Sequence, residues 1–227
     1  MRIPAGRRAA ALGAASVLLV TGCGGAYPGA AATLDGYRVP MSTVDEQAAA
    51  LCNIGPQVVL GSEAGQQVAA RTFRAIALSV QVQLRQAELA AEELGIDVPA
   101  DAATEEDLVT VGVPTEDLSE DDIDAVLHFY DDNIRVGTLR QRISQQLAEE
   151  SGAEQQAVEE ETAQFLEDQI DDVAVDPRLG VDENLEDTAA SGSVSVAVSE
   201  SARGLLAQDA AELESSVSDL PADQSCG

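Results

Sequence analysis

The chain has 227 residues, with 12 basic residues against 41 acidic ones and a formal net charge of −29 at pH 7. Such a surface repels the phosphates of nucleic acids and of anionic lipid headgroups, which excludes both as electrostatic partners. Aromatic residues make up 3% of the chain and tryptophan is absent, so the core must consist of Leu, Val, Ile and Ala side chains.

The first 22 residues have the pattern of an export signal. Arginines at positions 2, 7 and 8 precede an apolar stretch, 9–20, that is too short to cross a bilayer as a stable helix. The four residues 20–23, Val-Thr-Gly-Cys, resemble the lipobox of bacterial lipoproteins, in which the cysteine receives lipid and becomes the first residue of the mature protein. We therefore predict a signal peptide over 1–22 and acylation of Cys23.

Two features of this segment leave alternatives open. An ordinary secreted protein could be cut at an Ala-x-Ala-like site such as 30–32. The paired arginines at 7–8 also permit a twin-arginine export route, although the residues around them fit that motif poorly.

The mature chain is still more acidic than the full one. All twelve basic residues are arginine and three leave with the signal, so nine remain against 41 acidic residues, a net charge of −32. Electrostatic attraction cannot hold such a protein at a membrane, whereas two or three acyl chains can. We expect it at the outer, extracytoplasmic face of the cell membrane, anchored in the lipid bilayer through acylated Cys23.

Composition divides the mature chain into three parts. Residues 23–31 are small and read as a flexible tether. Residues 32–200 are long enough for one domain, and residues 201–227 form a tail rich in serine and aspartate that is either a weak helix or without regular structure.

The domain begins with signals for a hairpin and a helix. The Asp-Gly dipeptide at 35–36 is a strong turn signal between two short extended pieces within 32–40. Ser42 or Thr43, answered by an acidic residue three positions on, predicts a capping box and a first helix that runs to about Asn53.

Long amphipathic helices follow. The segment 63–94 contains no proline and predicts one helix that ends at Gly95. A short helix is expected from Thr104, and Ser119 caps a second long helix in which Gly137 is a candidate bend. The apolar positions of the two long helices are Phe73, Ile76, Val80, Leu84, Ala87, Ala91 and Leu94, and Ile123, Val126, Leu127, Tyr130, Ile134, Leu139, Ile143 and Leu147.

After Gly152 the pattern predicts one more helix and then changes period. The segments 173–175 and 194–198 alternate apolar and small residues, as strands do. The predicted fold is therefore mainly α, with long amphipathic helices and a small β element formed by short strands near both ends of the domain.

Two cysteines remain if Cys23 carries lipid. Cys52, at the end of the first predicted helix, and Cys226, at the C-terminus, would occupy an oxidising compartment, and we predict that they pair. The alternatives are two unpaired buried thiols, or a bond between Cys226 and another molecule.

Catalytic and metal-binding patterns are scarce. His128 is the single histidine and has no evident nucleophile as a partner, and no cysteine–histidine spacing suits zinc. The acidic runs 119–124 and 159–161 are explained by solvated charge and by the dipole of a helix N-terminus, and neither 120–124 nor 182–183 has the order of a calcium loop. We expect no cofactor, no metal and no enzymatic activity.

The order of these elements carries a resemblance. The lipobox, the strand pair around 34–39, the capped helix, the long helices and the closing segment 173–180 are similar to the N-terminal domain of SurA-type and PrsA-type periplasmic chaperones, and to the actinobacterial lipoproteins that carry this domain. In that family a Val-Asn-Gly segment precedes the first helix, and here Asp35 replaces the asparagine. The resemblance covers roughly 31–200.

The resemblance implies a helical module whose end strands close on one another and which cradles extended segments of unfolded or translocating proteins. Members of this family usually carry a prolyl isomerase domain as well. Residues 170–196 leave no room for it, so isomerase activity is not expected.

An apolar face formed by Phe73, Ile76, Val80, Tyr130 and Ile134 is the candidate surface for unfolded or secreted polypeptides. The alternative interpretation makes these residues the core between helices, in a structural or interaction lipoprotein of the cell envelope with one specific protein partner. Solute binding for a transporter fits less well, because the chain lacks alternating strands and helices.

Overall fold

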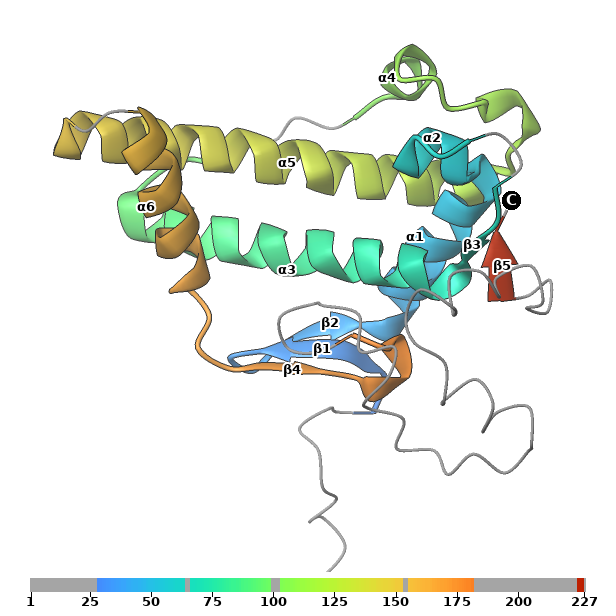
Figure 1. The fold of residues 1–227 in the computed structure, drawn as a ribbon, viewed down its shortest axis with the longest axis horizontal. Coiled ribbons are helices and arrows are strands. Elements are labelled where there is room, and N and C mark those ends of the chain that lie inside the picture. The colour runs from blue at the N-terminus through green and yellow to red at the C-terminus, as the bar shows by residue number, and fades with distance from the viewer. Residues whose placement is uncertain (1–27, 64–65, 99–102, 153–154, 182–223, 227) are drawn as a thin grey trace, which may run out of the picture.

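A computed structural model describes the larger part of the chain. The described residues are 28–63, 66–98, 103–152, 155–181 and 224–226. Within them the protein is mainly helical, with a small antiparallel sheet packed beneath the long helices (Figure 1). The predicted class, mainly α with a small β element, is confirmed.

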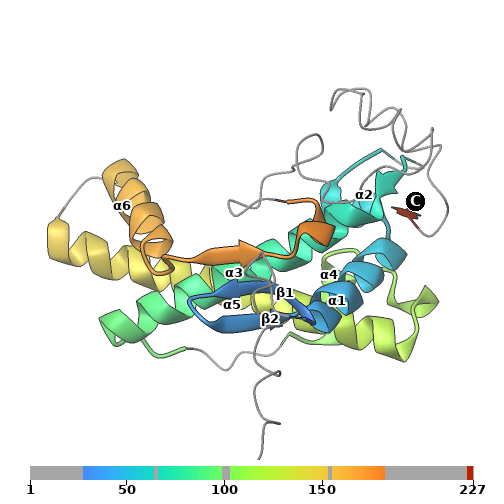
Figure 2. The same ribbon diagram turned by 90° about the horizontal axis from the view of Figure 1, so that it is seen from below.

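The sheet joins the beginning and the end of the described residues 28–181. Strands β1 (Ala30–Leu34) and β2 (Tyr37–Pro40) form the predicted hairpin, whose turn places Asp35 at φ 48° and Gly36 at φ 86°. Strand β4 (Val173–Val175) pairs antiparallel with the other edge of β1, which gives the order β2-β1-β4 (Figure 2). The hairpin is confirmed, and β1 starts two residues before the predicted extended segment.

The first helix, α1 (Met41–Ile54), follows β2 without a loop. The capping box predicted at Ser42 or Thr43 is wrong, because the helix already begins at Met41 and its N-cap, Pro40, makes no side-chain cap. The N–H of the first helical residue instead donates to the carbonyl of Gly29 over 2.8 Å. The residue before β1 therefore satisfies one of the N–H groups at the start of the helix that have no partner within the helix.

A short connection leads from α1 to the central helix. Helix α2 (Pro56–Leu60) precedes strand β3 (Val68–Ala69), and α3 (Ala70–Leu94) follows directly. The predicted helix start at residue 63 is wrong, because β3 is extended and pairs with β5 (Ser225–Cys226) from the far end of the chain. The predicted end is confirmed: Gly95 takes a left-handed conformation with φ 68°.

The next two helices begin where the sequence predicts, and both carry a side-chain cap. Thr104 and the aspartate three residues on form a reciprocal capping box at α4 (Glu105–Thr110). Ser119 accepts a hydrogen bond from the third backbone N–H of α5 (Glu120–Ser151). Helix α5 continues through Gly137 without a break.

Helix α6 (Gln155–Glu167), predicted after Gly152, crosses the ends of α3 and α5 (Figure 1). The chain then passes through β4 to Val181, the last residue of this described part. The strand predicted at 194–198 and most of the predicted tail, 201–223, lie outside the described residues.

Helix α3 contributes to three apolar clusters and is therefore buried on more than one side. The sheet cluster includes Leu34, Val44, Ala77, Leu78, Val82 and Leu179. The disulfide cluster includes Leu51, Ile54, Phe73, Val80, Val126, Phe129 and Cys226. The α6 cluster includes Ala87, Ala90, Ala91, Leu139, Ile143 and Leu166. The single apolar stripe predicted for this helix describes only part of its packing.

Candidate functional site

The five residues of the predicted apolar face are mostly buried. Phe73 is 0% exposed and Val80 is 9% exposed, and both belong to the disulfide cluster. Ile76 and Tyr130 pack against that cluster and are half-buried, whereas Ile134 is 37% exposed. The alternative interpretation, in which these residues form the core between helices, thus describes four of the five positions. Phe73 cannot touch a client in this conformation.

An open groove of about 500 Å³ lies between α1 and the start of α5. It is lined by Glu46 and Ala49 of α1 and by Asp121, Asp122, Asp124, Ala125 and His128 of α5. We call it the α1–α5 groove. Its lining combines four carboxylates with two alanine methyl groups, so it suits a positively charged group carried on an aliphatic stem.

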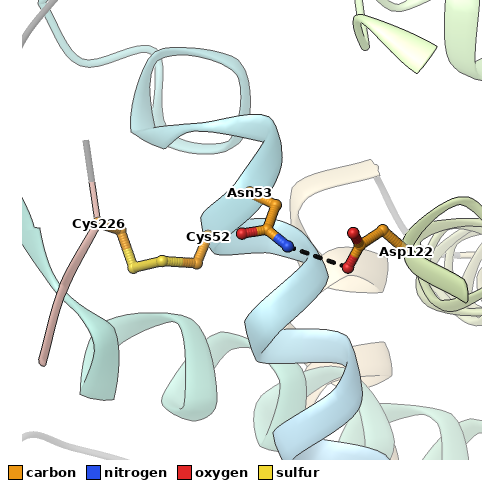
Figure 3. The surroundings of a disulfide bond; sticks show 4 residues. All are labelled: Cys52, Asn53, Asp122 and Cys226. Atoms are coloured by element: carbon orange, nitrogen blue, oxygen red, sulfur yellow. Dashed lines mark hydrogen bonds between the residues drawn. A yellow bond between two sulfur atoms is a disulfide. The ribbon is translucent and has the colours of Figure 1, made fainter. Parts of the chain in front are cut away.

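The ends of the two helices that form this groove are joined by side chains. The amide Nδ2 of Asn53, in the last turn of α1, donates to a carboxylate oxygen of Asp122 over 3.0 Å (Figure 3). The other oxygen of the same carboxylate accepts from the hydroxyl of Ser119, over 2.6 Å. The N-cap of α5 is therefore held to the end of α1.

A polar contact fixes the crossing of three helices deeper in the domain. The amide of Gln81 on α3 donates to the carboxylate of Asp132 on α5 over 2.7 Å, and Gln47 of α1 donates to the same oxygen over 3.3 Å. Gln47 is buried at 3% exposure. Because a buried amide needs hydrogen-bond partners, this contact specifies how α1 lies against the other two helices.

Three carboxylates of the groove remain available to a ligand. Glu46, Asp121 and Asp124 are exposed, and no hydrogen bond or ion pair within the described ranges engages them. His128 is exposed as well, and the groove lining contains no serine, threonine, cysteine or lysine that could act as a nucleophile beside it. The geometry therefore favours binding of a cationic segment over catalysis.

Metal binding finds no support in the part of the chain that the structure describes. No group of three or more His, Cys, Asp or Glu side chains there could hold a metal ion.

A second open groove, of about 450 Å³, lies along α6. Its lining residues are Ala157, Glu160, Glu161, Gln164, Phe165 and Asp168. Phe165 is half-buried against the α6 cluster. This groove is also acidic, but α6 and the residue directly after it, Asp168, supply its whole lining.

The two cysteines that the sequence analysis paired form a disulfide. Cys52, near the end of α1, and Cys226 of β5 have Cα atoms 5.2 Å apart, within the ordinary range for a disulfide (Figure 3). Cys226 is buried at 2% exposure within the disulfide cluster, whereas Cys52 is half-buried. Cys23, the predicted lipidation site, lies outside the described residues.

The sequence analysis missed the α1–α5 groove. Its signal was the acidic run 119–124, which the dipole of a helix N-terminus already explained. That explanation holds for Asp122, whose carboxylate bonds to the hydroxyl of the N-cap Ser119, but Asp121 and Asp124 face the groove with α1 opposite. A single sequence does not show that α1 packs there.

Comparisons with known proteins do not extend this description. No family model matches the chain, and no curated protein or solved structure does either. None of the helices in the described ranges combines the length and the apolar character that crossing a bilayer requires.

Proposed function

We propose that this protein is an extracytoplasmic lipoprotein, anchored in the cell membrane through acylated Cys23, that binds extended segments of unfolded or translocating polypeptides in a chaperone-like manner. It does so without prolyl isomerase activity. The observation that carries the proposal is the open α1–α5 groove, which is large enough for a few peptide residues and is held in shape from both of its helices.

The lining of the groove defines the segments that it would hold. Lysine and arginine stems would pack on Ala49 and Ala125, while their charged ends reach the carboxylates of Asp121 and Asp124. The high negative charge of the chain would attract such segments from a distance and repel acidic ones. The proposed clients are therefore cationic, amphipathic segments instead of purely apolar ones.

The arrangement of the sheet supports the same proposal. The resemblance to SurA-type and PrsA-type domains implies strands near both ends of the domain that close on one another, and β1 pairs with β4 in this way. This pairing supports the fold that the resemblance implies. The proposed preference for cationic clients rests on the α1–α5 groove alone.

Light scattering tests the proposal directly. A soluble version that starts at Gly24 contains every described residue, and it is mixed at increasing ratio with a chemically unfolded basic secreted protein. We expect suppression of aggregation at near-stoichiometric ratios. The Asp121→Lys/Asp124→Lys double variant should lose most of this effect, because its groove repels cationic segments.

Two controls separate the groove from general charge. The Glu149→Lys/Glu150→Lys variant makes the same charge change at the far end of α5 and should suppress aggregation like the unmodified protein. Ala49→Phe fills the groove without changing charge and should weaken suppression. Equal suppression by all variants, each shown to be folded by circular dichroism, would refute the groove as the binding site.

A second function is favoured by the closed apolar core. Because Phe73, Ile76, Val80 and Tyr130 are occupied with packing, the protein could instead be an interaction lipoprotein with one specific envelope partner. In that case the folded, disulfide-bonded protein would suppress no aggregation of unrelated clients. The same light-scattering experiment thus distinguishes the two functions.

A further inference from the structure

The C-terminal segment behaves like a peptide bound to the rest of the domain. Strand β5 pairs antiparallel with β3, with Val68 opposite Cys226 and Ala69 opposite Ser225. Within the described ranges β5 is the one strand that pairs with β3, and the two form a sheet of their own (Figure 1). The arrangement is that of β-strand addition, in which an extended peptide lines up along an exposed strand edge.

This pairing depends on more than its backbone hydrogen bonds. A sheet of two strands with two residues each is not stable by itself. What holds β5 in place is the side chain of Cys226, which is 2% exposed among apolar residues, and its covalent bond to Cys52. Without that bond, a short contact would have to hold the end of a long chain segment.

We propose that the edge of β3, together with the apolar position that Cys226 fills, is a binding site for an extended peptide with a small apolar side chain at that position. The chain's own C-terminus occupies the site in this structure, and reduction of the disulfide opens it. The site is formed by other residues than the α1–α5 groove, so this inference does not depend on the proposed client groove.

Opening requires a dithiol reductant. Its thiolate attacks the sulfur of Cys52, the more exposed of the two cysteines, and forms a mixed disulfide while the bond to Cys226 breaks. The electron pair of the broken bond goes to the sulfur of Cys226, which takes up a proton. The second thiol of the reductant then closes the reductant's own disulfide and releases Cys52 as a thiol. The protein gains two thiols and the reductant loses two.

A disulfide-capture experiment tests this proposal. Two soluble versions that start at Gly24 are compared, one ending at Asp223 without β5 and one of full length with Cys226→Ala. Each is incubated in a glutathione redox buffer with a peptide that copies residues 220–227, and intact-mass spectrometry measures the peptide bound to Cys52. The matched control is a peptide of the same composition, scrambled around a cysteine at the same position.

The version that ends at Asp223 should capture the matching peptide about tenfold more than the scrambled one, because docking raises the local thiol concentration. The Cys226→Ala version should show the same preference with less capture, since its own C-terminus competes. Equal capture of both peptides by both versions, with helix content retained, would overturn the proposal. The Cys226→Ala version keeps the experiment decisive if the truncated one does not fold.

Discussion

Two parts of the molecule tie distant chain segments together by different means. In the sheet, β4 pairs with β1, and the carboxylate of Asp35 accepts hydrogen bonds from the backbone N–H groups of Asp171 and Asp172 over 3.0 and 2.9 Å. Next to the start of α3, β5 is joined to the domain by two paired residues and one disulfide. The first closure consists of many weak contacts and the second of a single strong one.

The difference predicts how each closure responds to change. Loss of one contact in the sheet should lower the free energy of unfolding by about the contribution of that contact alone, because the apolar cluster around Leu34 remains packed. Loss of the disulfide should release the C-terminal segment and leave the rest folded. The two closures are therefore expected to be separable.

The largest expected effect comes from Cys226→Ala. For a sequence separation of 174 residues the chain-entropy model gives about 5 kcal/mol. A released C-terminal segment regains part of this entropy in the folded protein, so we expect the free energy of unfolding to fall by about 2–4 kcal/mol. Urea unfolding followed by circular dichroism measures the change.

The control for this prediction is Ser225→Ala, which keeps the disulfide and should change the free energy of unfolding by less than about 0.5 kcal/mol. A Cys226→Ala variant without native helix content would mean that the disulfide holds the whole domain. The two closures would then not be separable.

A smaller effect is expected from Asp35→Ala in the sheet. The change removes two hydrogen bonds that a carboxylate accepts and places alanine at φ 48°, which disfavours the turn. We expect a loss of about 1–2 kcal/mol in the free energy of unfolding, measured by urea titration. Asp35→Asn keeps a side-chain oxygen and tolerates this φ, so it should lose less. Equal losses of unfolding free energy in the two variants would contradict a specific contribution of the Asp35 side chain to this turn.

The smallest effect concerns Asp176, which follows β4. Hydrogen bonds from the side chain of Arg178, the shortest 2.6 Å, hold the pKa of this carboxyl below its ordinary value of 3.8. A lowered pKa stabilises the folded state fully above 3.8, and the stabilisation disappears as the pH falls through the folded-state pKa. Arg178→Gln should therefore reduce stability slightly at pH 7 and not at a pH below both pKa values. Urea titrations at the two pH values measure this, and a pH-independent loss would contradict it.

Sequence reasoning succeeded where a signal is local. The Asp-Gly turn at 35–36, the short helix from Thr104 and the cap at Ser119 depend on neighbouring residues, and all three are present. The cap at Ser42 or Thr43 failed because α1 already begins at Met41, whose N–H donates to the carbonyl of Gly29.

Features that depend on contacts between distant segments could not be predicted from the sequence. The start of α3 depends on a strand from the far end of the chain, and the α1–α5 groove depends on how two helices cross. The apolar periodicity of α3 likewise did not reveal that several elements cover this helix.

Hydrogen exchange of the soluble protein, compared between its oxidised and reduced forms, tests most directly whether the two closures are separable. Reduction should accelerate exchange of the backbone N–H groups of 68–69 and 225–226, while those of 30–34 and 173–175 keep their protection. Acceleration of similar size in both groups, or no change at 68–69, would contradict the account.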